Sequence, residues 1–164
     1  MSTGSINICR LIKEKLDEKG LPVAWLARHT GRKEDSLRKT LNHNRDIYIN
    51  RLFHISVALK EDFFACYSER LKKIAPFYCN KSHTEMETET EGINICQLIK
   101  ERLDEQNLPV AWLARQIGCD KDNLRKILTK NRNIYTDLLF NISVTLEEDF
   151  YAYYSEKLRK TLNG

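Results

Sequence analysis

Two nine-residue segments of this chain carry basic side chains at the same spacing. Residues 34–42 read EDSLRKTLN and residues 121–129 read KDNLRKILT. On a helical wheel of about 100° per residue, Leu37, Thr40 and Leu41 fall on the buried side. The outward set is then Asp35, Arg38, Lys39 and Asn42, matched by Asp122, Arg125, Lys126 and Thr129. Exposed guanidinium and ammonium groups bind anions through charge-assisted hydrogen bonds, so the chemistry these segments offer is recognition.

The same pattern also fits a solvated helix face. Asp35 and Arg38, like Asp122 and Arg125, stand three residues apart and are spaced to form surface ion pairs. Such acids would also repel phosphate. Both interpretations stay open at the level of the residues alone.

The sequence contains no comparable pattern of catalytic residues. There is no nucleophile motif, no phosphate-cradling glycine loop and no metal-ligand spacing. The five cysteines form no CxxC pair, and the four histidines are not repeated in the second half of the chain. We therefore expect neither an enzyme nor a metal site, with no cofactor and no small-molecule substrate.

The chain is a duplication. Residues 6–73 and 93–160 align without a gap at an offset of 87, and 44 of the 68 aligned residues are identical. A unit of about 68 residues is long enough to bury a core, although with a small margin. Because two copies are too few to stabilise each other by stacking, we expect each copy to fold alone.

Charge is distributed unevenly between the copies. Residues 6–73 carry 15 Lys and Arg against 9 Asp and Glu, whereas residues 93–160 carry 11 against 10. Residues 74–92 hold one Lys and four Glu with few apolar residues after Lys81, which predicts a flexible acidic linker. A basic first copy favours a polyanion as partner, although ordinary surface charge explains it as well.

Apolar residues in each copy recur at helical spacing. The first copy predicts a helix ending at Gly20, a short one over 23–28, a third over 34–42 and an apolar fourth one carrying Leu52 to Leu59. A fifth helix carries Phe63, Phe64 and Tyr67, matched by Phe150, Tyr151 and Tyr154. These aromatic residues fit core packing, with a partner-binding face as the alternative. The fold class we predict is all-α.

The stretch Trp25-Leu26-Ala27-Arg28, with Gly31, Leu37 and Leu41 after it, resembles the helix-turn-helix of the lambda-repressor-like (XRE/Cro-type) family. The second copy repeats it as Trp112-Leu113-Ala114-Arg115, with Gly118, Leu124 and Leu128. The small Ala lets the two helices cross closely, the Gly makes the turn, and the later Leu residues hold the second helix on the core. The resemblance covers nearly all of each copy and implies two tandem five-helix DNA-binding domains, 6–73 and 93–160.

The resemblance implies that the third helix of each copy enters the major groove of duplex DNA. Arg38 and Arg125 are then the base-reading candidates, because a guanidinium pairs with guanine through two hydrogen bonds. Asn42 and Thr129 lie on the same faces and differ, so the two copies would read different half-sites. The candidate phosphate contacts are Lys33, Lys39, Arg45, Lys121, Lys126, Lys130 and Arg132.

One position departs from the family pattern. Family members often have Gln at the first residue of the second helix, where it contacts a phosphate. Here that residue is Val23 in one copy and Val110 in the other. The departure weakens the case for DNA binding.

The sequence thus predicts a bacterial transcriptional regulator, with repression as the favoured mode, that acts as a covalent pseudo-dimer on DNA. The alternative is an interaction module or antitoxin-like protein that kept the fold and lost strong DNA binding. Its partner, or a second chain, would then meet the fifth-helix aromatics. No stretch of 18 apolar residues and no apolar signal core occur, so we expect no membrane contact and a cytoplasmic location.

Overall fold

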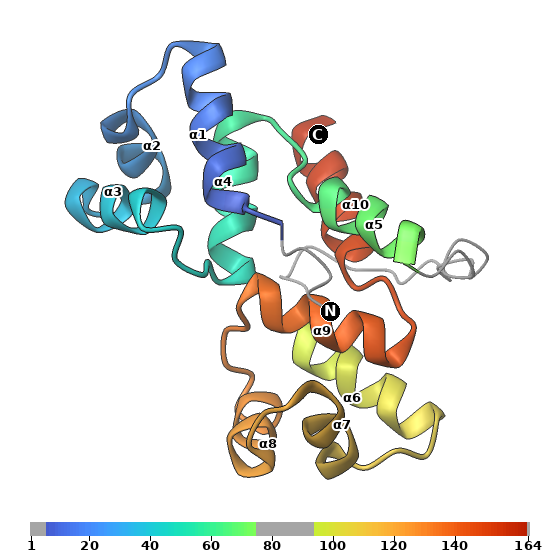
Figure 1. The fold of residues 1–164 in the computed structure, drawn as a ribbon. Coiled ribbons are helices and arrows are strands. Elements are labelled where there is room, and N and C mark those ends of the chain that lie inside the picture. Colours follow the sequence, from blue (N-terminus) through green and yellow to red (C-terminus); the bar gives the residue numbers. More distant parts are fainter. Residues whose placement is uncertain (1–5, 75–93, 164) are drawn as a thin grey trace.

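The computed structural model describes residues 6–74 and 94–163, and both ranges are helical with short connections (Figure 1). The first half (6–74) contains α1 (Ile8–Lys19), α2 (Val23–Thr30), α3 (Glu34–Asn42), α4 (Ile49–Leu59) and α5 (Phe64–Ile74). The second half (94–163) contains α6 (Ile95–Glu105), α7 (Val110–Ile117), α8 (Lys121–Thr129), α9 (Thr136–Leu146) and α10 (Tyr151–Asn163). The predicted all-α class is confirmed, while the predicted linker lies almost entirely outside the described residues.

Local sequence explains where these helices begin and end. Asn7 and Asn94 cap α1 and α6, each accepting a hydrogen bond from a backbone N–H of the first turn at 3.1 Å. Gly20 follows α1 in the left-handed conformation, and Asn107 takes the corresponding place after α6. Asp120 caps α8 by accepting from the Asn123 backbone N–H at 3.1 Å, whereas Lys33 makes no side-chain cap for α3. The sequence predicts both results, because Asp is a favourable N-cap residue and Lys is a poor one.

The core of each half forms where its first four helices meet. In the first half, α2 packs on α3 and α4, and α1 packs on α3. Leu26, Leu37, Leu41 and Leu52 are fully or almost fully buried there, as are their counterparts in the second half. The apolar fourth helices α4 and α9 are buried along much of their length, although Phe53 and Val57 are only partly covered.

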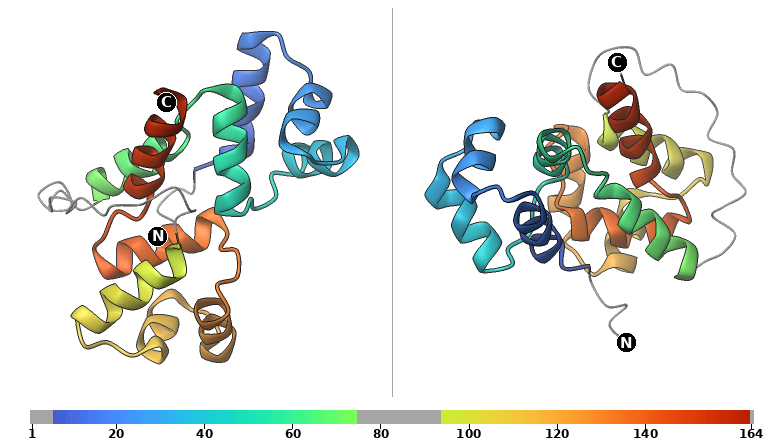
Figure 2. Two further views of the ribbon diagram at one scale, coloured as in Figure 1. Left: turned by 180° about the vertical axis from the view of Figure 1, so that it is seen from behind. Right: turned by 90° about the horizontal axis from the view of Figure 1, so that it is seen from above.

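The fifth helices are exchanged between the halves. α10 packs on α4 of the first half, α5 packs on α9 of the second half, and α5 and α10 lie side by side (Figures 1 and 2). If each copy folded alone, as the sequence predicts, its fifth helix would pack on its own copy. The exchange gives the two halves a shared apolar core instead.

The aromatic contacts of the exchange come in reciprocal pairs. The rings of Phe64 and Tyr154 stack with centroids 5.1 Å apart, and those of Tyr67 and Tyr151 stack at 4.5 Å. At the offset of 87, Phe64 corresponds to Tyr151 and Tyr67 corresponds to Tyr154. Each contact is therefore repeated with the halves interchanged, which is the signature of a two-fold symmetric interface. The fifth-helix aromatic residues, whose alternative role is a partner-binding face, are buried against the other half.

The backbone repeats the same reciprocity at the start of the fourth helices. The Ile49 N–H donates to the Ile134 carbonyl at 2.7 Å, and the Thr136 N–H donates to the Ile47 carbonyl at 2.9 Å. Between these bonds, the rings of Tyr48 and Tyr135, which are equivalent residues, stack with centroids 4.1 Å apart. The pseudo-two-fold axis of the molecule therefore passes between these two tyrosines.

Replacing Tyr67 by Ala should destabilise both halves together. The side chain is 1% exposed and stacks on the other half, so its removal leaves a cavity and should cost about 3–5 kcal/mol of unfolding free energy. Urea unfolding followed by circular dichroism should show a single transition at lower midpoint. Tyr67→Phe keeps the ring and should lose under about 1 kcal/mol; two separate transitions in Tyr67→Ala would contradict a shared core.

A second substitution tests the uncapped helix. Lys33→Ser should add about 0.5–1 kcal/mol of unfolding free energy, because it supplies the side-chain cap that α8 already receives from Asp120. Asp120→Ala is the matched change and should lose about the same amount. If thermal melts showed the Tm of both variants shifting in the same direction, this account of the helix starts would be refuted.

Candidate nucleic-acid interface

The second and third helices of each half form a helix-turn-helix arrangement. α2 ends at Thr30, Gly31 takes a left-handed conformation with φ 67°, and α3 begins at Glu34. Gly118 has φ 74° and plays the same part between α7 and α8. Ala27 and Ala114 are buried at the helix crossing, where a larger side chain would push the helices apart. The predicted bounds of both third helices, 34–42 and 121–129, are confirmed.

The outward faces of α3 and α8 carry the predicted side chains. Leu37 and Leu41, like Leu124 and Leu128, point into the core. The base-reading candidates of both copies are exposed, namely Arg38, Asn42, Arg125 and Thr129. Exposure is what a groove-reading residue requires, and it equally suits a solvated face.

Arg38 and Arg125 are both held by carboxylates of their own helix. The Arg38 guanidinium pairs with Glu34, one turn earlier, so the predicted partner Asp35 is wrong. Spacings of three and of four residues both place two side chains on one helix face, and the second copy has Lys121 where the first has Glu34. Arg125 pairs with the predicted Asp122, Nη1 to Oδ1, at 3.9 Å. Both Arg side chains are more than half exposed, so each pair contributes little stability and is easily exchanged for another anion.

The loops that follow α3 and α8 carry the phosphate-contact candidates Arg45 and Arg132. Asn44 and Asn131 turn each chain out of its helix with φ 49° and 51°. Both loops run on to the Tyr48–Tyr135 stack, so Arg45 and Arg132 are placed on either side of the pseudo-two-fold axis. The other phosphate-contact candidates, Lys33, Lys39, Lys121, Lys126 and Lys130, are all exposed on or beside the same two helices.

Two buried cysteines anchor these loops. The Cys9 thiol donates to the carbonyls of Thr40 and Arg45 at 3.5 and 3.3 Å, and the Cys96 thiol does the same to Ile127 and Arg132 at 3.4 and 3.5 Å. Burial raises the pKa of both thiols, so they remain neutral donors. The sequence interpretation left them without a role, although their identical place in both copies was the available signal. Cys79, which the sequence places in the linker, lies outside the described residues.

Arg51 is a cation that the sequence interpretation missed. Its Nε is buried without a hydrogen-bond partner among the described residues, and burial followed by repulsion from Arg32 lowers its pKa. It lines a polar groove of about 630 Å³ with Arg45, Tyr48 and Tyr135. The second half has Leu138 at the equivalent position, in a groove of about 650 Å³. Each groove therefore has two cations, Arg45 and Arg51 in the first half and Lys130 and Arg132 in the second, and only the first also has a carboxylate, Asp46.

Two carboxyl groups meet at one side of the axis. Asp46 and Asp137 lie close enough to share a proton, and burial, reinforced by Asp46, raises the pKa of Asp137 to about 6. On the other side the equivalent residues are Asn133 and Asn50, whose amides hydrogen-bond at 2.7 Å. The duplication has thus left a titratable pair and a neutral pair at equivalent places.

Comparison with known proteins adds no assignment. No protein-family model, no curated protein and no solved structure matches the chain. Within residues 6–74 and 94–163, no helix is long and apolar enough to cross a membrane. The described residues also contain no group of three or more His, Cys, Asp and Glu side chains that could hold a metal ion.

The carboxyl pair predicts how stability depends on pH. Asp137 binds a proton more tightly in the folded state than in the unfolded chain, so folding free energy should weaken as pH rises from about 4 to about 6. Asp137 is half-buried, so this part of the pH dependence should amount to about 1–2 kcal/mol, below the value that the full shift of the pKa would give.

Asp137→Asn should remove this part of the pH dependence and leave the protein more stable than wild type at pH 7. Urea unfolding at a series of pH values measures both effects. The neighbouring charged and titratable groups are Arg45, Cys9, Tyr67 and Tyr151, and the exposed Asp104→Asn serves as control. A variant that kept the wild-type slope between pH 4 and 6 would show that the pair does not share a proton.

Proposed function

We propose that this protein binds duplex DNA as a bacterial transcriptional regulator, with its two halves acting as a covalent pseudo-dimer in the cytoplasm. The observation that carries the proposal is the presentation of two equivalent helices, α3 and α8, each with an exposed Arg and Lys, by one pseudo-two-fold symmetric molecule. A two-fold axis in the protein matches the two-fold axis of a palindromic DNA site. The resemblance of both helix pairs to the lambda-repressor-like helix-turn-helix supports the same conclusion.

The positions of the cations fit this role. Arg38 and Arg125 would read base edges in successive major grooves, with Asn42 and Thr129 beside them. Arg45 and Arg132 would contact phosphates near the centre of the site, where the loops meet. Each half-site would then be bound by one helix pair and one loop.

Covalent linkage and packing compensate for weak contacts. Val23 and Val110 cannot make the phosphate contact that Gln makes in the family, and both pack partly against the core. Because the second helix pair is already positioned when the first one binds, its contacts are made at high effective concentration. Two halves that each bind DNA weakly can therefore still bind a full site together.

The two half-sites are expected to differ in sequence and in affinity. Asn42 corresponds to Thr129, Lys33 corresponds to Asp120, and Arg51 corresponds to Leu138. Residues 34–46 carry three Lys and Arg against three Asp and Glu, whereas residues 121–133 carry five against one, so α8 and its loop should make the stronger contact. The preferred DNA site is therefore an imperfect palindrome.

The Arg38→Ala/Arg125→Ala double variant tests the proposal. Fluorescence anisotropy with a mixed-sequence duplex pool should show wild-type binding that weakens steeply between about 50 and 200 mM salt. The double variant should bind at least about tenfold more weakly at each salt concentration.

Arg10→Ala/Arg159→Ala is the matched control. Both of these arginines are exposed and ion-paired to a carboxylate of their own helix, with Glu14 and Glu156, but they lie outside the helix-turn-helix faces. This variant should bind DNA like wild type. Equal weakening by both double variants would mean nonspecific charge attraction, and no binding at the lowest salt would favour the protein-interaction alternative.

A further inference from the structure

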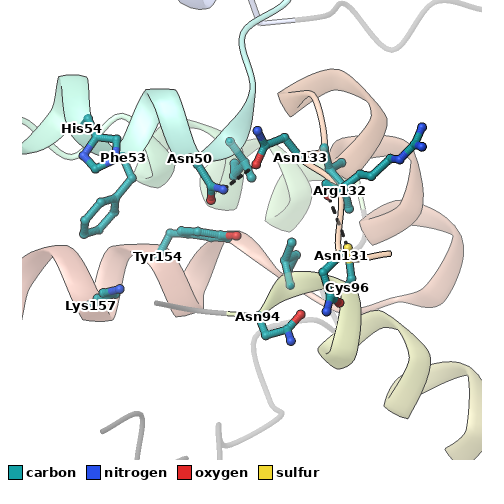
Figure 3. Close-up of a pocket in the computed structure, with 13 residues that line it drawn as sticks. Asn50, Phe53, His54, Asn94, Cys96, Asn131, Arg132, Asn133, Tyr154 and Lys157 are labelled. Atoms are coloured by element: carbon teal, nitrogen blue, oxygen red, sulfur yellow. Dashed lines mark hydrogen bonds between the residues drawn. The ribbon is translucent and has the colours of Figure 1, made fainter. Parts of the chain in front are cut away.

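A pocket of about 380 Å³ lies between the two halves, on the side of the axis that carries the amide pair (Figure 3). Its wall is formed by the start of α4, the start of α6, the loop 131–134 and α10. Its volume falls within the range of small-molecule sites, and its lining combines apolar side chains with a few polar groups. None of its residues was predicted from the sequence to bind a ligand, apart from Arg132.

The hydroxyl of Tyr154 supplies an unused hydrogen-bond donor. The side chain is 2% exposed, yet its hydroxyl has no hydrogen-bond partner among the described residues. Figure 3 shows the hydroxyl end of the ring directed toward the loop that carries Asn131 and Asn133. A buried polar group without a partner is costly, and a ligand acceptor in the pocket would remove that cost.

The electrostatics of the pocket favour a negative charge. α4 and α6, each 11 residues long, present their first residues to it, so two helix N-termini point the positive ends of their dipoles at the same space. Lys157 reaches over the Phe53 ring, with its Nζ 5.2 Å from the ring centroid. The described residues that line the pocket include no Asp or Glu.

The equivalent space on the other side of the axis is different. It has a volume of about 230 Å³ and is lined by Asp46 and Asp137, where the first pocket has Asn133 and Asn50. Two carboxyl groups would repel an anion. The duplication therefore leaves one pocket suited to an anion in each chain, and this asymmetry exists only because the copies have diverged.

We propose that the pocket between α4, α6 and α10 binds a small monocarboxylate with an apolar, ring-sized body. The carboxylate accepts from the Tyr154 hydroxyl and an Asn50 amide N–H, while the apolar body extends toward Phe53 and packs on Phe53 and Ile95. The occupant contacts both halves and stabilises their packing, as an effector and not as a substrate. This site does not depend on DNA binding.

Titration of the full chain with sodium benzoate tests the site. Benzoate at constant ionic strength, followed by ¹H–¹⁵N correlation spectra, should give saturable shifts with a Kd of about 1 mM or tighter. Tyr154→Phe should weaken binding about tenfold, because it removes only the donor. Asn50→Asp should abolish binding, because it recreates the charge of the opposite pocket.

Tyr67→Phe is the matched control, since it removes the equivalent hydroxyl of the other half and should leave the affinity unchanged. Circular dichroism melts establish that each variant is folded. Unsaturable shifts, equal affinity in Tyr154→Phe, or competition by inorganic phosphate at equal concentration would overturn the proposal.

Discussion

The exchange of the fifth helices is the contact on which the rest of this structure depends. Each copy of about 68 residues has only a small core of its own. The fifth helix of each copy begins with aromatic residues that pack against the other half. Packing α10 on α4 and α5 on α9 buries four aromatic rings in reciprocal stacks. The same packing brings the starts of α4 and α9 together, so the orientation of both helix-turn-helix units follows from it.

Contacts across the axis also hold the loops beside it in place. Two backbone hydrogen bonds and the Tyr48–Tyr135 stack tie the loops to each other, while the buried thiols of Cys9 and Cys96 tie each loop to its own first helix. Side chains on a loop anchored in this way are presented in a fixed place without being buried. Arg45 and Arg132 are therefore positioned groups on an ordered surface, which is the property that both phosphate contact and partner recognition require.

Duplication within one chain permits the two sides of the axis to differ, which is not possible in a homodimer. In a homodimer, every substitution beside the axis appears twice, so two equivalent pockets remain the same. Here the halves diverge independently. One side of the axis carries a carboxyl pair and the other an amide pair, and Arg51 beside the axis has only Leu138 as its counterpart. Charge, titration and ligand preference can therefore differ between the two sides while the packing stays symmetric.

The sequence by itself determined the helices and the bounds and exposed faces of α3 and α8, because these depend on local periodicity, glycine and capping residues. The second helix of the first copy, predicted over 23–28, runs on to Thr30, and the fifth begins after Phe63. Even Asp120 and Lys33 were read correctly as a cap and a non-cap, since a cap acts within one turn. The partner of Arg38 was misjudged, because two acids lay within reach and side-chain packing selects between them. The exchange of α5 and α10, the Asp46–Asp137 pair, the buried Arg51 Nε and the pocket at Tyr154 were decided only by the tertiary structure. Each depends on residues about 80 to 100 positions apart, and the apolar pattern of a helix states that a face is buried without stating which half covers it.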